Sequence, residues 1–92
     1  MLLYIEDKLI NMDNVISVKV KCRDVSNNYS IVFSMISGED EYCFCFNKKH
    51  MAVEILKYIV RTIQYSISIS TSVTYITNDK VHEHLVDVYG EC

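Results

Sequence analysis

The chain has 92 residues, half of them hydrophobic, and its nine lysines and arginines against twelve acidic residues give a net charge of −3. A chain of this length builds a single domain, residues 1–92, because two separate cores would each be too small. The acidic balance differs from that of a dedicated nucleic-acid binder, so such binding would need a local basic patch. With two glycines and no proline, the sequence also excludes flexible or proline-rich linkers.

No stretch of the chain is apolar over the roughly 18 residues that indicate a membrane-spanning helix. The N-terminal residues also lack the basic segment that opens a signal peptide. We therefore expect a cytoplasmic protein with no membrane partner. In that compartment the four cysteines are expected to stay reduced and to act mainly as small buried side chains; they are Cys22, Cys43, Cys45 and Cys92.

The first third of the chain predicts three strands. Residues 2–5 and 9–12 are short apolar runs around a polar turn at residues 6–8, which is typical of a hairpin. Residues 16–23 alternate with period two. One face of this strand carries Ile16, Val18, Val20 and Cys22, and the other carries Ser17, Lys19, Lys21 and Arg23. Turn-forming side chains at residues 24–28 then end the strand.

The middle of the chain predicts a second hairpin. Residues 29–36 are apolar on both faces, as expected for a central strand, and Gly38 in the following turn can adopt the positive φ that tight turns need. Residues 41–46 should therefore pair antiparallel with residues 29–36. Their alternation places three aromatic residues on a face expected to pack on a helix; these are Tyr42, Phe44 and Phe46. Cys43 and Cys45 fall on the opposite face, where small side chains suit close approach by another layer or subunit.

The second half of the chain predicts one long helix over about residues 48–64. Asn47 is a suitable N-cap, and apolar residues recur at helical spacing behind it; they are Ala52, Ile55, Leu56, Ile59, Val60 and Ile63. Residues 64–76 alternate as a strand does, although residues 64–68 fit the end of the helix as well. One face of that strand carries Ile67, Ile69, Val73 and Tyr75. Residues 80–89 can form a short final helix or strand.

Together these elements predict an α+β domain. An antiparallel sheet of about five strands packs on one long helix and is followed by a C-terminal strand and a short tail. One sheet face and the alternating strand after the helix would then remain uncovered, which favours the binding of a second protein.

Cysteine and histidine residues give only weak metal candidates. Cys43 and Cys45 lie on one face of a strand with Cα atoms roughly 6.5 to 7 Å apart, which is too far for most disulfides. Joined by Cys22 or a histidine they could ligate a metal ion, as could His82 and His84 in an extended tail. The second paired motif that a zinc site needs is missing. We therefore expect no metal site and no cofactor.

No residue pattern indicates an enzyme. The serine-rich segment lacks the G-x-S-x-G turn of a nucleophile, and two glycines cannot build a phosphate-binding loop. No cysteine, histidine and aspartate stand out as a nucleophile with its base. We expect a protein without catalytic activity.

Basic residues form a candidate nucleic-acid surface. Lys19, Lys21 and Arg23 project from one strand face, and Lys57 and Arg61 add cations on the helix. If these groups merged into one surface they could bind phosphates. Acidic residues are interspersed among them, so an ordinary solvated surface is the favoured interpretation.

The order of features in residues 3–60 resembles small uncharacterised bacterial and phage proteins built from two β-hairpins and a helix. The residues that carry the resemblance are the segment LINMDNV at residues 9–15, the turn at residues 37–39, and Phe46 and Asn47 leading into Ala52 and Leu56. It covers about two thirds of the chain. The resemblance implies a fold type and a phage or mobile-element context, and it supplies no catalytic residue.

We expect a non-catalytic protein-interaction module that associates first with itself, through an apolar sheet face or an exposed strand edge. A phage or mobile-element inhibitor of a host factor would fit this description. The alternative is a small nucleic-acid-binding or regulatory protein that uses the strand face of Lys19, Lys21 and Arg23.

Overall fold

The structure, a computed structural model, describes residues 1–23 and 28–90. Within this part of the chain it contains six strands, two α-helices and the 3-10 turn η1 (Met12–Asn14). The strands are β1 (Leu2–Ile5), β2 (Lys8–Asn11), β3 (Val15–Cys22), β4 (Tyr29–Met35), β5 (Asp40–Phe46) and β6 (Val73–Ile76), and the helices are α1 (Lys49–Ser68) and α2 (Asn78–Tyr89). Most of the turn predicted at residues 24–28 lies outside the described residues.

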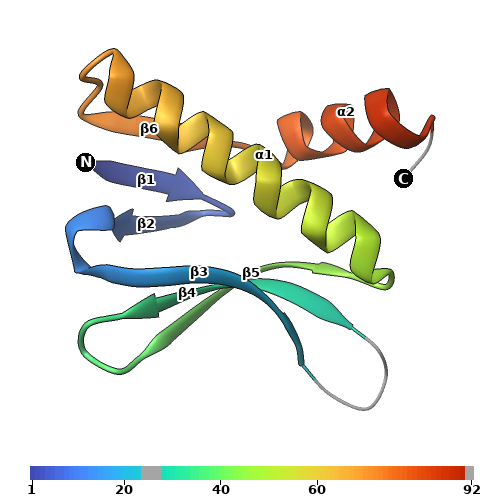
Figure 1. Cartoon of the computed structure of the whole chain (residues 1–92), viewed down its shortest axis with the longest axis horizontal. Helices are drawn as coiled ribbons and strands as arrows, with labels where there is room; N and C mark the ends of the chain where they lie inside the picture. Colours follow the sequence, from blue (N-terminus) through green and yellow to red (C-terminus); the bar gives the residue numbers. More distant parts are fainter. Residues whose placement is uncertain (24–27, 91–92) are drawn as a thin grey trace.

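The predicted α+β class is confirmed, but the strands form two sheets of three instead of one sheet of about five (Figure 1). One sheet has the order β2-β1-β6 and the other β3-β4-β5, and the η1 turn separates β2 from β3. β6 pairs parallel with β1, whereas the other pairs are antiparallel. Parallel strands need a long crossover connection between them. Here α1 is part of the connection that places β6 beside β1.

The structure confirms both predicted hairpins, and turn chemistry explains them. Glu6 and Asp7 connect β1 to β2 with φ angles of 48° and 61°, the positive values that two-residue hairpin turns require. Gly38 adopts a φ of 92° between β4 and β5. Its N–H donates to the carbonyl of Met35 at 3.0 Å. β4 is the central strand of its sheet, as predicted.

Both sheets and both helices contribute to one core. α1 runs diagonally across the molecule, and α2 lies beside its N-terminal half (Figure 1). The buried cluster consists of Leu3, Ile5, Ile10, Ile31, Phe33, Cys43, Ile55, Ile59, Ile76, Val81 and Leu85. The prediction of a single packed helix is therefore incomplete, because α2 supplies two of these side chains.

α1 is longer than predicted and takes in residues 64–68. The strand interpretation of this segment is wrong: Ile67 and Ile69 are 62% and 53% exposed and do not share a covered strand face. Side-chain hydroxyls bond to carbonyls about one turn back, as when Ser68 Oγ donates to the Tyr65 carbonyl at 2.6 Å. Such bonds give the hydroxyl groups of serine and threonine a partner inside a helix. Val60, expected on the apolar stripe, is partly exposed at its margin.

The C-terminus of α1 closes in a Schellman motif without glycine. The Thr71 N–H donates to the Ser66 carbonyl at 3.0 Å and the Ser70 N–H to the Ile67 carbonyl at 3.1 Å, which are the two bonds of that motif. Ser70 occupies the left-handed position with a φ of 58°. Since glycine usually marks this position, the sequence carries no clear signal for the end of α1.

The start of α1 also differs from the prediction. α1 follows Lys48, which makes no side-chain capping bond, so the predicted N-cap Asn47 is wrong. At the start of α2 the side chain of Thr77 accepts a hydrogen bond from the Lys80 N–H at 3.2 Å. Gly90 ends this helix with a φ of 79°. The tail whose structure the sequence leaves open is therefore helical.

A β-bulge changes the alternation of β5. The register pairs Ile31 with Cys43 but Tyr29 with Phe46, so residues 44 and 45 face a single residue of β4. Phe44 takes a φ of 61° at this point. Before the bulge an odd-numbered residue, Cys43, faces the core, and after it an even-numbered residue, Phe46, does so.

The bulge overturns half of the predicted face assignment. Cys43 is fully buried in the core, although the sequence predicted it opposite the helix. Tyr42 pairs with Val32 and lies on the outer face of the sheet. Phe44 and Phe46 do pack against the core, as predicted.

Candidate functional site

The outer face of the β2-β1-β6 sheet carries an apolar patch, which we call the Tyr4 face; it consists of Leu2, Tyr4, Leu9 and Tyr75. Leu9 and Tyr75 are 61% and 59% exposed. Alternate residues of the same strands point into the core, which turns these four outward. Leu9, Tyr4 and Tyr75 lie side by side across the three strands, and the centroids of the two tyrosine rings are 5.8 Å apart.

No formally charged side chain belongs to the two strand rows of the Tyr4 face. The first row is Leu9, Tyr4 and Tyr75, and the second is Asn11, Leu2 and Val73. A partner can therefore cover this face without taking an unpaired charge out of water.

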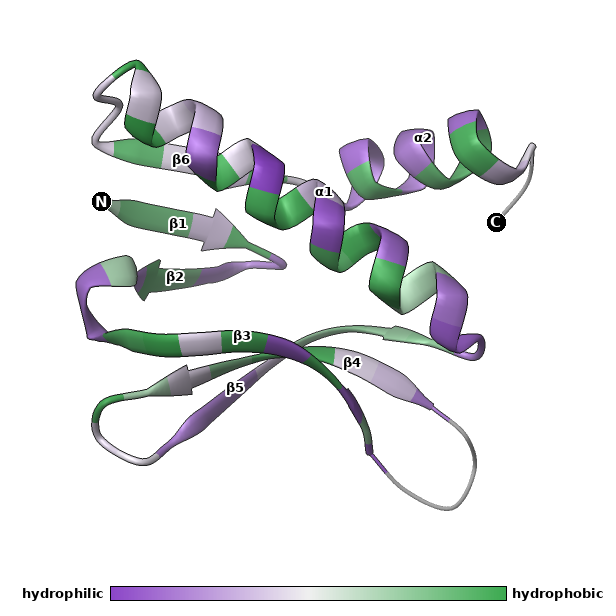
Figure 2. Cartoon of the chain, viewed as in Figure 1, coloured by the Kyte–Doolittle hydropathy of each residue, from purple (hydrophilic) through white to green (hydrophobic). Residues whose placement is uncertain are grey.

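Sequence reasoning found only part of the Tyr4 face. It placed Tyr75, together with Val73 of the same strand, on an uncovered strand face, but it missed Leu2, Tyr4 and Leu9. The available signal was that residues 2–5 are all apolar, which is expected of a strand with apolar side chains on both faces. Figure 2 shows β1 in the hydrophobic colour along most of its length.

Lys19 and Lys21 project from the outer face of the β3-β4-β5 sheet, as predicted, while Val18 and Val20 pack toward the core. A register shift in β3 turns Ile16 outward, where it is exposed and not on the predicted core face. The alternation of this strand is therefore confirmed after the shift.

Tyr42 joins the lysines and Arg23 in what we call the basic face: Lys19, Lys21, Arg23 and Tyr42. The Arg23 guanidinium lies 4.6 Å from the centroid of the Tyr42 ring, and Lys21 Nζ donates to the Tyr42 hydroxyl at 3.3 Å. Cation–π attraction of this kind covers the tyrosine ring with a positive charge. Sequence reasoning missed Tyr42 because the bulge that turns it outward has no glycine to mark it.

Lys57 and Arg61 do not extend the basic face. They lie on α1, which packs on the inner side of the β3-β4-β5 sheet, whereas Lys19 and Lys21 project from its outer side. Arg61 also forms an ion pair with Glu54, with Nη2 and Oε2 3.4 Å apart. The two predicted groups of cations therefore stay separate.

The structure does not gather the candidate metal ligands. Cys43 is buried in the core, Cys45 is exposed beyond the bulge, and Cys22 is exposed at the end of β3. Among residues 1–23 and 28–90, no group of three or more His, Cys, Asp and Glu side chains is placed to hold a metal ion. Cys92 lies outside the described residues.

His82 and His84 point in different directions because the tail is helical, and residues two apart on a helix do not share a face. His82 is exposed, whereas His84 packs between α2 and α1.

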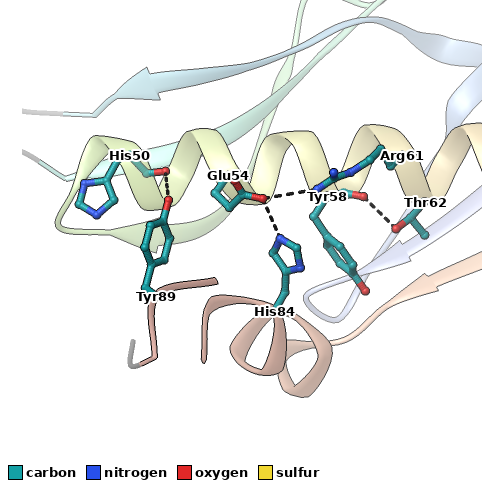
Figure 3. A network of polar contacts seen from close by, with 7 residues as sticks. All are labelled: His50, Glu54, Tyr58, Arg61, Thr62, His84 and Tyr89. Atoms are coloured by element: carbon teal, nitrogen blue, oxygen red, sulfur yellow. Dashed lines mark hydrogen bonds and ion pairs between the residues drawn. The ribbon is translucent and has the colours of Figure 1, made fainter. Parts of the chain in front are cut away.

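A polar network connects α2 to α1 (Figure 3). His84 Nε2 lies 2.8 Å from Glu54 Oε2, and the imidazole stacks on Tyr58 with ring centroids 4.8 Å apart. One turn further along α2, the Tyr89 hydroxyl donates to the carbonyl of His50 at 3.3 Å. The hydrogen bond from His84 lowers the pKa of Glu54 below its usual range, with smaller contributions from nearby cations. This network holds one helix to another and includes no group arranged as a nucleophile with its base.

Comparison with known proteins found no relative of this chain. No protein-family model, no curated protein and no solved structure matches the chain. Neither of the two helices in the described residues is long and apolar enough to cross a membrane.

Proposed function

We propose that the chain is a non-catalytic protein-interaction module of the cytoplasm that associates with a second copy of itself through the Tyr4 face. The observation that carries the proposal is the uncharged row of Leu9, Tyr4 and Tyr75 across three strands. Exposed contiguous apolar surface of this kind marks interaction sites. An inhibitor of a host factor, encoded by a phage or mobile element, would act through the same face.

Charge favours the Tyr4 face over the basic face for pairing of identical copies. Two Tyr4 faces can stack around a two-fold axis without bringing like charges together, because neither strand row carries one. Two basic faces would place Lys19, Lys21 and Arg23 opposite their own copies, and this like-charge contact is unfavourable.

The size of the patch sets the expected affinity. Four such side chains expose on the order of 400 Å², a size that single proteins expose and often use for binding. Stacking two patches buries roughly 800 Å² in total, below the range of stable complexes. We therefore expect a weak dimer that forms at micromolar to millimolar concentrations and that a heterologous partner can displace.

Sedimentation equilibrium between about 5 and 500 μM tests this affinity range. The wild-type chain should show a monomer–dimer equilibrium, and Leu9→Lys with Tyr75→Lys should stay monomeric with an unchanged circular dichroism spectrum. Ile67→Lys adds a charge at an exposed apolar residue outside the Tyr4 face and should leave the equilibrium unchanged. A wild-type chain that is monomeric throughout, or loss of the dimer in the Ile67 variant alone, would contradict the proposal.

The second candidate function is binding of RNA or single-stranded DNA on the basic face. The observation in its favour is that Lys21 and Arg23 lie against the Tyr42 ring, with Lys19 on the same strand face, as in platforms that combine phosphate contacts with base stacking. The observation against it is that Arg23 already lies over the Tyr42 ring, so a base would have to displace it.

Fluorescence anisotropy with a labelled oligonucleotide separates the two functions. Binding that falls steeply with salt and is lost in Lys19→Glu with Lys21→Glu would support the second candidate. The matched control is Lys57→Glu with Arg61→Glu, which reverses two charges on the other side of the sheet. Equal losses in both double variants would indicate nonspecific attraction only.

A further inference from the structure

An open groove of about 510 Å³ lies where the β1–β2 turn, the end of β5 and the starts of both helices meet. Its apolar lining includes Phe44, Phe46, Met51, Val81 and Leu85. The volume is within the range of small-molecule sites, which are mostly apolar with a few polar groups. The groove is formed by residues other than those of the Tyr4 face and the basic face, so it is a separate site.

Two aromatic rings form one wall of the groove. Phe44 and Phe46 both line it, and their ring centroids lie 6.2 Å apart. Phe44 holds this position through the β-bulge, with a φ of 61° that bulky residues rarely adopt. Strained backbone of this kind persists where the surrounding structure fixes it, and it clusters at binding sites.

Glu6 supplies the charge of the groove. Among the described lining residues it is the one acidic side chain, and none of them is a lysine or an arginine; the others with polar groups are three asparagines, Cys45 and His82. The Glu6 carboxylate accepts a hydrogen bond from the Phe44 N–H at 2.9 Å through Oε2. The ammonium of Lys8 donates to the Tyr42 carbonyl and does not line the groove. The groove is thus apolar, aromatic and negatively charged.

We propose that this groove binds a small arylalkylammonium ion. The aryl group packs against the side chains of Phe44, Phe46 and Met51, and the ammonium lies beside the Glu6 carboxylate. Aromatic rings attract an organic cation through their negative faces, and the carboxylate adds a charge-assisted hydrogen bond. A carboxylate ligand of the same shape is repelled by Glu6.

Three probes of nearly equal shape test the charge preference: 2-phenylethylammonium, 2-phenylethanol and 3-phenylpropionate. Amide shifts in ¹H–¹⁵N correlation spectra are followed as each is added to the wild-type chain. The ammonium should bind with a dissociation constant on the order of 1 mM, as expected for a ligand of this size. Saturable shifts should cluster at residues 44–51 and 78–85, the alcohol should bind roughly fivefold more weakly, and the propionate should not bind.

The variant Glu6→Gln removes the charge but keeps a side-chain oxygen that can accept the Phe44 N–H. It should bring the ammonium down to the affinity of the alcohol. Glu41→Gln makes the same change of charge on β5 outside the groove and should behave as wild type. Phe46→Leu, which keeps apolar volume, should weaken the ammonium about threefold. Equal or tighter binding of the propionate, shifts centred elsewhere, or no saturable shift with the ammonium would overturn the proposal.

Discussion

A single backbone angle determines the environments of two cysteines. Phe44 has a φ of 61°, and its N–H donates to the Glu6 carboxylate at 2.9 Å, so the β1–β2 turn holds the bulge in place. Cys43 before the bulge enters the core with no exposed surface, and Cys45 beyond it is exposed. The two thiols should therefore differ in reactivity although one residue separates them.

Cys43 should resist alkylation in the folded protein. Burial raises its pKa from 9.0 to about 11, so the reactive thiolate is scarce at pH 8, and the core excludes the reagent. A short pulse of iodoacetamide at pH 8, followed by peptide mapping, should label Cys45 and Cys22 and leave Cys43 unmodified. The same pulse in denaturant should label all three. Comparable labelling of Cys43 and Cys45 in the folded chain would contradict the bulged register.

The raised pKa of Cys43 also predicts that the folded protein loses stability in alkali. Because the folded pKa of Cys43 is about 11 and the ordinary value is 9.0, the unfolded chain releases this proton first as the pH rises. The free energy of unfolding should then fall between these two pH values. Urea titrations at several pH values should show that Cys43→Ala has a shallower fall than wild type. Parallel curves would show that Cys43 contributes nothing to the slope.

At this scale, period-two alternation predicted most side-chain directions and failed where a bulge intervened. Lys19 and Lys21 were placed correctly. Tyr42 and Cys43 were placed on the wrong faces, because a bulge residue in the left-handed conformation is normally marked by glycine and here it is Phe44. The pairing of Arg23 with Tyr42 could not be predicted either, since it depends on that same shift.

At the scale of elements, Ser70 is a position where stability can be gained. It holds the left-handed residue of the Schellman motif with a φ of 58°, a conformation that glycine adopts without steric cost. Ser70→Gly should raise the free energy of unfolding by about 0.5 to 1 kcal/mol in urea titrations. Ser72→Gly, two residues further on, should not stabilise, because Ser72 does not have a positive φ. A gain in both variants would contradict the proposed cause.

Contact of α2 with α1 should weaken in acid. The hydrogen bond from His84 lowers the pKa of Glu54, so the unfolded chain takes up this proton first as the pH falls. The contribution of Glu54 to the free energy of unfolding is therefore fully present above the ordinary pKa of 4.5. It is lost as the pH drops through the lower pKa of the folded state. Glu54→Gln should cost on the order of 0.5 kcal/mol at pH 7 and less at pH 3, below the ordinary pKa of the carboxyl group. Unfolding titrations at the two pH values measure this difference, and Glu83→Gln, an exposed carboxylate on α2, is the matched control.

The two hairpins were predictable because a turn signal marks each of them, whereas the end of α1 was not. Gly38 marked the second hairpin, and the polar residues 6–8 marked the first. The end of α1 was ambiguous because Ser and Ile alternate over residues 66–70 as they would in a strand. The segment is helical up to Ser68, and backbone hydrogen bonds from Ser70 and Thr71 close its last turn.

At the scale of the whole molecule, the pairing of β6 with β1 was the feature least accessible from sequence. The two strands are far apart in the chain, and their parallel pairing depends on how α1 packs across both sheets. Local pattern could identify residues 73–76 as a strand but not its neighbour. The sequence therefore placed Tyr75 on an uncovered face but could not place it beside Tyr4.

The shared core predicts that the two sheets unfold together. Ile5 of the β2-β1-β6 sheet and Ile31 of the β3-β4-β5 sheet are both fully buried in one cluster that also contains Ile55 and Ile59 of α1. Ile5→Val and Ile31→Val should each lower the free energy of unfolding by about 0.5 to 1.5 kcal/mol. In both variants, far-ultraviolet circular dichroism, tyrosine fluorescence and alkylation of Cys43 should report one common midpoint in urea. A midpoint for Cys43 alkylation that moves in Ile31→Val but not in Ile5→Val would show instead that the sheets are separate cooperative units.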